Sequence, residues 1–290
     1  MLDFFSDRTW LWIGAAFYAA AFLSATLAML RSRGQSRLLV LTLVCCGLVA
    51  QTLGLHQRGL SAHGCPLRNT FEIVQFVIWS FTVLYLVVGP AFRVSLLGYF
   101  TSGLAAVMSM TSLFVGRWDG PMRAPIFGGN PWIEVHASLA LFAYGAFGTL
   151  ALTSLMFLLQ TFSLKRKHLR GIFSFLPSIV ALETMNYRLL LTGLAVLSFS
   201  ISVGYVYYAR TPESIGIGKL LIATGVWLAY LCVLFLRVRR LLVSNGLAWA
   251  CLGLFGIALI SIPLINSGLK RAQPVSNAQS VIVVSSVRKP

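Results

Sequence analysis

The sequence predicts an all-α polytopic membrane protein, a bundle of about eight transmembrane helices with both termini on the outer, periplasmic side. Of its 290 residues, 58% are hydrophobic and only 10% are charged, whereas a soluble domain has about 25% charged residues. The apolar residues gather in long runs separated by short loops, without the alternating pattern of an outer-membrane barrel. We therefore expect a single membrane domain over residues 1–266 and a mobile polar tail over 267–290.

The net charge of +16 is a topology signal and does not indicate nucleic-acid binding. Lys and Arg gather at one end of the predicted helices, as the positive-inside rule requires. With the N-terminus outside, the inner loops carry more of these cations than the outer loops. The sequence thus predicts a multi-pass protein of a bacterial-type cytoplasmic (inner) membrane, in contact with lipid and without a nucleic-acid partner.

The first four predicted helices are 9–30, 38–55, 71–90 and 95–115. The first has Trp10 and Trp12 at its outer edge and reads as a retained anchor, because no basic signal segment precedes it. The second ends at the outer side near His56. The third follows a capping pattern, with Glu72 three residues after Asn69. The fourth is an apolar run without polar landmarks.

The last four predicted helices are 133–162, 187–209, 217–236 and 246–266. Asn130 and Pro131 supply an N-cap and a first-turn residue for the fifth helix, which ends in a basic run inside. A short interfacial helix begun by Pro177 is expected before the sixth. The seventh starts near Lys219 and ends in inner arginines, and the eighth is apolar.

His136 is the leading candidate for a functional residue. The fifth helix places Trp132 and His136 on one face, with His136 about a turn and a half inside the outer surface. Ionisable groups within a membrane are usually functional, and an imidazole suits a metal or haem ligand. The alternative is a structural histidine that bonds a backbone carbonyl or Glu72. The turn-rich loop 116–129 is expected to form a lid near this residue.

Several phrases occur in a fixed order along the chain: Cys65-Pro66-Leu67-Arg68-Asn69-Thr70-Phe71-Glu72, Val135-His136-Ala137 with Tyr144, Leu164-Lys165, Leu176-Pro177-Ser178, and Tyr187-Arg188-Leu189 with Gly193. Together they resemble the cytochrome c assembly membrane proteins of the CcsA and HemX-like type, over residues 38–253. The resemblance implies haem handling during c-type cytochrome biogenesis. It also implies that His136 is the ligand of the haem iron, that other assembly membrane proteins and apocytochrome c are partners, and that a partner performs the thiol chemistry.

The resemblance changes before the seventh helix, where the family has a tryptophan-rich segment. Lys219 matches the family's lysine, but Ile217 and Leu220 replace acidic residues, and Phe235 stands where a membrane histidine is expected. In this respect the chain resembles the HemX-like branch. The alternative function is therefore a cofactor-free regulatory or scaffolding membrane protein.

Further candidate site residues lie at the outer level of His136. His56 is a candidate second axial ligand, with simple interfacial placement as the alternative. Arg68 and Lys219 are candidate partners of the haem propionates, or equally of lipid headgroups. His63 and His168 are expected to be solvated. Because the sequence contains no hydrolase triad, H-E-x-x-H motif or phosphate loop, we expect an assembly factor and not an enzyme.

Overall fold

The computed structural model describes residues 6–31, 36–62, 64–92, 95–120, 131–165, 178–210, 217–242 and 244–267, and these residues form helices and short connections. The elements are α1 (Asp7–Leu30), α2 (Arg37–Ala62), α3 (Thr70–Phe92), α4 (Ser95–Phe114), the 3₁₀ helix η2 (Gly116–Trp118), α5 (Pro131–Lys165), α6 (Ile179–Arg210), α7 (Ile217–Val238) and α8 (Ser244–Ser267). Within these described residues, seven helices are long and apolar enough to cross a membrane, and α8 contributes a shorter apolar stretch, Ser244–Ala258. The predicted fold class, an all-α polytopic membrane protein, is confirmed.

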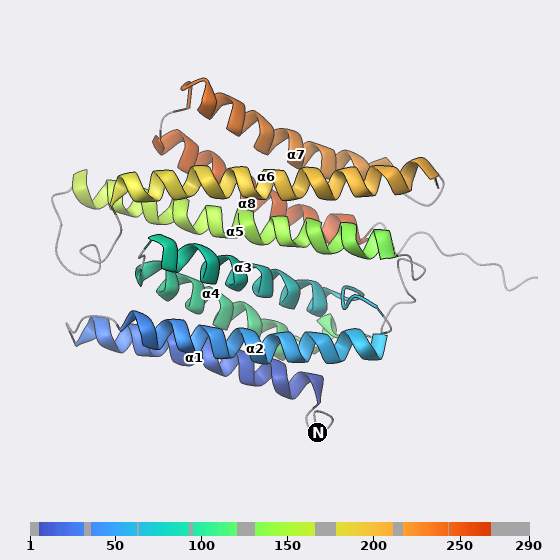
Figure 1. Cartoon of the computed structure of the whole chain (residues 1–290), viewed down its shortest axis with the longest axis horizontal. Helices are drawn as coiled ribbons and strands as arrows, with labels where there is room; N and C mark the ends of the chain where they lie inside the picture. The colour runs from blue at the N-terminus through green and yellow to red at the C-terminus, as the bar shows by residue number, and fades with distance from the viewer. Residues whose placement is uncertain are drawn as a thin grey trace, which may run out of the picture.

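The helices α1 to α8 lie side by side as an elongated bundle, and successive helices run in opposite directions (Figure 1). The start of α1 and the end of α8 lie at the same end of the bundle, together with the start of α5 (Figure 1). We call this the outer end, following the predicted orientation. Which side of the membrane this end faces stays a prediction.

The bundle is built from two groups of helices that meet along α3 and α5. Within the first group, α1 packs against α2 and α4, and α3 packs against α4. In the second, α5 packs against α6 and α8, and α7 lies on α6 and α8 (Figure 1). At the seam, a Cβ atom on Gly145 would lie 2.6 Å from the Cβ of Ser80. The missing side chain therefore lets α3 and α5 approach closely.

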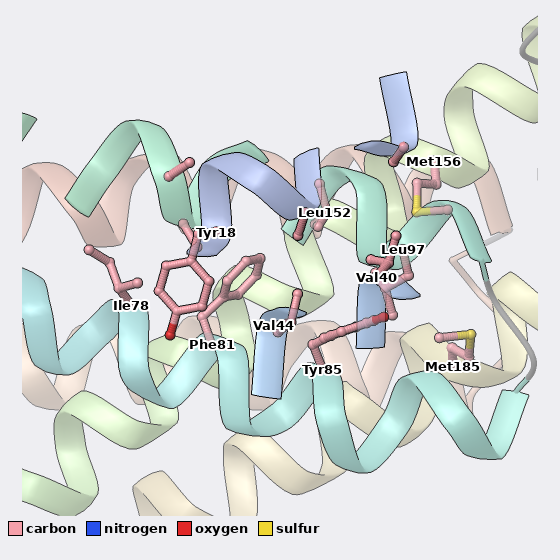
Figure 2. Packing of buried hydrophobic residues seen from close by; sticks show 14 of the residues in the cluster. Tyr18, Val40, Val44, Ile78, Phe81, Tyr85, Leu97, Leu152, Met156 and Met185 are labelled. Atoms are coloured by element: carbon pink, nitrogen blue, oxygen red, sulfur yellow. The ribbon is translucent and has the colours of Figure 1, made fainter. Parts of the chain in front are cut away.

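Among the described residues, one buried apolar cluster joins helices α1 to α6 and α8. Figure 2 shows Tyr18 of α1, Phe81 of α3 and Leu97 of α4 in this cluster, with Met156 of α5 and Met185 of α6 at its edge. All five side chains are buried, at 5% exposure or less. The cluster thus holds the first group of helices against the second.

A chain of buried polar side chains runs through the first group of helices. The hydroxyl of Tyr18 donates to Oε1 of Gln51 at 2.8 Å, and Nε2 of Gln51 donates to Oε1 of Gln75 at 2.7 Å. Gln75 in turn donates to the hydroxyls of Ser112 at 2.8 Å and Ser109 at 3.2 Å. Because hydrocarbon offers no hydrogen bonds, these internal bonds hold α1, α2, α3 and α4 in one register.

The prediction of a separate short interfacial helix before the sixth span is wrong. The helix α6 is continuous from Ile179 to Arg210. Leu182, Met185 and Leu189 are buried on one of its faces, so packing against the bundle carries the helix through this segment. The second helix also extends beyond its predicted end, to Ala62.

Some predictions fall outside the described residues. These are the solvated histidines His63 and His168, the polar tail over 268–290 and most of the predicted lid, of which only 116–120 is described.

Candidate functional site

The His136 ring is held by the backbone of α6. Its Nδ1 atom lies 2.7 Å from the carbonyl oxygen of Ser200. A carbonyl oxygen only accepts hydrogen bonds, so Nδ1 carries the proton, and in the neutral imidazole Nε2 carries the lone pair. The hydroxyl of Ser200 donates back to the His136 carbonyl at 2.8 Å. The two helices are therefore tied by reciprocal bonds at the position of the imidazole.

A glycine makes room for this ring. A Cβ atom on Gly204 would lie 2.7 Å from both Cε1 and Nδ1 of His136, closer than real Cβ atoms approach other heavy atoms. The bond from His136 to a backbone carbonyl, which the sequence analysis gave as the structural alternative, is therefore formed with Ser200. This bond uses Nδ1 and leaves Nε2 available. Both hydrogen bonds of the ring involve Nδ1, and no described residue forms a hydrogen bond with Nε2. The site presents a half-buried imidazole of fixed tautomer at the outer end of α5.

The opposite face of α5 contacts the loop between α2 and α3. The Oε2 atom of Glu134 accepts a hydrogen bond from the backbone N–H of Cys65 at 3.2 Å. The hydroxyl of Ser138 lies 3.2 Å from the Sγ atom of Cys65. Burial raises the pKa of the Cys65 thiol, the hydrogen bond with Ser138 offsets part of this rise, and the charges of Glu134 and Glu72 raise the pKa further. Because the thiolate is the nucleophile, a raised pKa favours a packing role for Cys65.

A cavity of about 430 Å³ opens between α2, the following loop and α3. It is lined by Thr52, Leu55, His56, Gly59, Leu60, Gly64, Pro66, Phe76 and Trp79. The Trp79 indole donates to the Thr52 hydroxyl at 2.9 Å, which leaves the imidazole of His56 as the ionisable group in an apolar wall. His56 and His136 therefore face different elements, and the structure does not bring their rings together.

An ion cluster, which we call the outer charge cluster, joins α1, α2, α3 and η2. The guanidinium of Arg58 donates to both carboxylate oxygens of Asp119 at 2.8 Å each, and it also bonds Asp7 and Glu72. The Arg58 and Glu72 side chains are only 12% and 1% exposed. The sequence analysis missed this cluster, since it considered Glu72 as a helix cap or as a partner of His136 and not as a partner of Arg58.

The predicted cap of α3 is confirmed within the same cluster. The side-chain oxygen of Asn69 accepts the N–H of Glu72 at 2.8 Å, and the Glu72 carboxylate accepts the N–H of Arg68 at 2.6 Å. Both bonds satisfy amide N–H groups at the start of α3. Glu72 forms no hydrogen bond with His136, so the predicted alternative of such a bond is not found.

The other predicted site residues are spread around the outer end. Arg68 donates from its guanidinium to the carbonyl of Ala62, which closes the loop after α2. Trp132 is 64% exposed one turn before His136. Lys219 lies in the first turn of α7, where only the backbone is described. The sequence signal for the missed partners of His136 is the one-turn spacing of the small residues Ser200 and Gly204.

Acid is expected to weaken the outer charge cluster through Asp119. Burial raises the pKa of its carboxyl, but the hydrogen bonds and charge of Arg58 outweigh burial and hold the pKa below its usual value. A carboxyl with a lowered folded-state pKa stabilises fully above its unfolded pKa of about 4, and this contribution is lost as pH falls through the folded pKa. The excess thermal stability of the wild type over Asp119→Asn should therefore shrink between about pH 5 and pH 3. A constant difference between their unfolding midpoints would contradict this assignment.

Comparison with known proteins identifies the family. The family model described as "Cytochrome C assembly protein" matches residues 67–269, from the loop before α3 to just beyond α8. The chain belongs to this family. Membership in the cytochrome c assembly family supports a role in cytochrome c biogenesis and agrees with a multi-pass membrane protein. Helices α1 and α2, including His56, precede the matched region.

Curated relatives of this assembly-family chain fall into two named groups. This chain is 30% identical to "Protein HemX" of Brevibacillus brevis over 49% of its own length and 52% of the relative. It is 26% identical to "Cytochrome c biogenesis protein CcsA" of Mesostigma viride over 43% of this chain and 40% of the relative. For "Protein HemX" of Bacillus subtilis (strain 168), 24% identity extends over 70% of this chain and 74% of the relative. The chain thus spans about half the length of the first relative and less of the second.

Proposed function

We propose that this protein binds haem at the outer end of its bundle during c-type cytochrome assembly, with His136 as the axial ligand. The observation that carries the proposal is the hydrogen bond from Nδ1 of His136 to the carbonyl of Ser200. Histidines that ligate metals usually donate their other ring N–H to a carbonyl or carboxylate, which fixes the ring and makes the ligating nitrogen more basic. His136 has this arrangement, and family membership supports haem as the ligand.

The surrounding residues fit an amphiphilic cofactor. Trp132, exposed one turn before His136, offers an apolar ring at the rim of the site. Arg68 and Lys219 are the proposed cations for the two propionates of haem. Bound haem supplies the group that c-type cytochromes carry, while this chain binds and orients it. Apocytochrome c and other assembly membrane proteins in the inner membrane are the proposed partners, and a partner performs the thiol chemistry.

The second candidate function is a cofactor-free regulatory or scaffolding role. The similarity to two proteins named HemX favours it. So does Phe235, which is 55% exposed on α7 where the resemblance to the family leads us to expect a membrane histidine. In this case His136 is a structural link between α5 and α6, and the bond to Ser200 is its whole role.

Cytochrome levels in cells separate the two functions. His136→Ala is expected to lower the amount of mature c-type cytochrome about tenfold or more, because the iron loses its ligand. Val135→Ala, at an exposed neighbouring position, serves as the control and should leave the level unchanged. If deletion of the whole protein lowers the amount of mature c-type cytochrome while the His136→Ala variant keeps the wild-type amount, the scaffolding role is favoured. A deletion without effect on the level would exclude both roles in this pathway.

A further inference from the structure

We propose that the turn between α7 and α8 binds the headgroup of an anionic phospholipid, and that Arg239 and Arg240 hold its phosphate. The turn lies at the end of the bundle opposite the outer end, which we call the inner end (Figure 1). The helix α7 lies at the edge of the bundle and packs mainly against α6 and α8, so its other side meets lipid (Figure 1). Such a lipid site does not depend on haem binding at His136.

The two arginines have no carboxylate partner in the described part of the chain. Their neighbour Arg237 is already paired, because its guanidinium donates to Glu183 on α6. Arg239 and Arg240 are exposed, and no described carboxylate forms an ion pair with either. Glu183 is also the one acidic residue in the sequence segments 31–37, 91–96, 163–188 and 236–245, which flank the inner helix ends. The anion that pairs with the two arginines must therefore come from outside the chain.

Arg239 lies along the lipid-facing side of α7. Its guanidinium carbon is 5.2 Å from the centre of the Phe235 ring, one turn earlier in the helix. Phe235 and Val238 are 55% and 62% exposed, so the arginine stem runs over an apolar surface. A long cationic side chain in this position keeps its charge at the boundary between acyl chains and headgroups. The anion available at this depth is the phosphate of a lipid.

Arg240 has a left-handed backbone that glycine adopts more readily. Its φ of 57° is the sole positive value for a non-glycine among the described residues. The N–H of Arg240 donates to the carbonyl of Arg237 at 3.0 Å. The N–H of Leu241 donates to the carbonyl of Leu236 at 3.0 Å, which completes a helix end whose left-handed position is usually glycine. An arginine here costs conformational energy, and such strain gathers where a side chain is used. Arg237 and Arg239 already satisfy the positive-inside rule without it.

An anionic phospholipid matches both the charge and the apolar surface of the turn. Leu241 directly follows the two arginines and is 70% exposed, so the cations lie between apolar side chains of the turn and of α7. A soluble anion would pair with the charges and leave these side chains uncovered. A phospholipid places its phosphate on the guanidinium groups and its acyl chains on the apolar side chains. A headgroup with a net negative charge, such as phosphatidylglycerol, is attracted more strongly than a zwitterionic one.

Thermal unfolding of the full-length protein in lipid nanodiscs tests this proposal. Discs of phosphatidylcholine alone are compared with discs of equal parts phosphatidylcholine and phosphatidylglycerol, and wild type is expected to unfold at a higher temperature in the mixed discs. Arg239→Gln and Arg240→Gly should lose most of this rise. Each should also weaken phosphatidylglycerol binding in detergent about fivefold, the effect of about one surface cation. In phosphatidylcholine alone, Arg240→Gly should unfold above wild type, because glycine relieves the left-handed backbone.

Arg31→Gln is the matched control. Arg31 is an exposed cation that follows α1 at the same end of the bundle, in the other group of helices. Its substitution removes the same charge without touching the turn, so this variant should keep the rise in mixed discs.

Three results would overturn the lipid site. The first is an equal unfolding temperature of wild type in the two kinds of disc. The second is a loss of the same size in Arg31→Gln and in the turn variants, which would mean that the total charge of the inner end attracts the lipid. The third is a rise of wild type in phosphatidylcholine discs with inorganic phosphate as large as that with phosphatidylglycerol, which would assign the turn to a soluble anion.

Discussion

Arg58→Met is expected to destabilise the folded protein by about 3–5 kcal/mol, the largest stability effect that we predict for a single substitution. The guanidinium is nearly buried and neutralises carboxylates from α1, α3 and the residue after η2. It also lies 4.5 Å over the ring of Phe71, which adds a cation–π contact. Without it, Asp7, Glu72 and Asp119 repel one another with little water to screen them. Unfolding in mild detergent, followed by tryptophan fluorescence, measures the loss.

Arg8→Met is the matched control for this prediction. Arg8 belongs to the same cluster, but its side chain is 43% exposed and its nitrogen lies 3.7 Å from Asp119. An exposed ion pair contributes only about 0–1 kcal/mol, so Arg8→Met should change the unfolding midpoint little. Equal effects of the two substitutions would contradict the central role of Arg58 in the cluster.

Gly204→Ala is expected to lower haem affinity about 10–100-fold, the effect usual for residues that orient a metal ligand. The added methyl group would lie 2.7 Å from two atoms of the His136 ring. The ring must turn away, which breaks the bond from Nδ1 to the Ser200 carbonyl and displaces Nε2. The fold should persist, because an alanine favours the helix that surrounds it.

Ser202→Ala separates positioning of the ring from a general disturbance of α6. Ser202 is exposed two residues before Gly204, and among the residues that the structure describes its hydroxyl bonds only the carbonyl of Ser198, within the helix. We expect wild-type haem affinity for Ser202→Ala and a shifted iron spectrum for Gly204→Ala. An unchanged spectrum and affinity in Gly204→Ala would mean that the orientation of His136 does not matter for the ligand.

The fold class was predictable because the bilayer restricts the possible answers. Only long apolar runs with internally bonded backbones cross hydrocarbon, so run length and flanking charge are enough to find the helices. The start of α6 was predicted wrongly, since its first turns are stabilised by burial of Leu182 and Met185 against other helices. Such tertiary packing leaves no local signal in the sequence.

The candidate site was only partly predictable. The depth of His136 in its helix is a local property, and it follows from the start of α5 at Pro131. The rotation of α5 against α6 is not local, so Ser200, which lies 64 residues away, was not foreseen as its partner. The outer charge cluster was missed for the same reason, because Arg58 lies 51 residues from Asp7 and 61 from Asp119.

The central claim is that His136 ligates haem through Nε2, and its most direct test is the absorption spectrum of the purified protein. Wild type and His136→Ala are expressed with ample haem, purified in detergent and compared in their oxidised and reduced forms. We predict a Soret band with histidine-ligated character in wild type and its loss or displacement in His136→Ala. Spectra without haem in both proteins would contradict the claim and favour the cofactor-free scaffold.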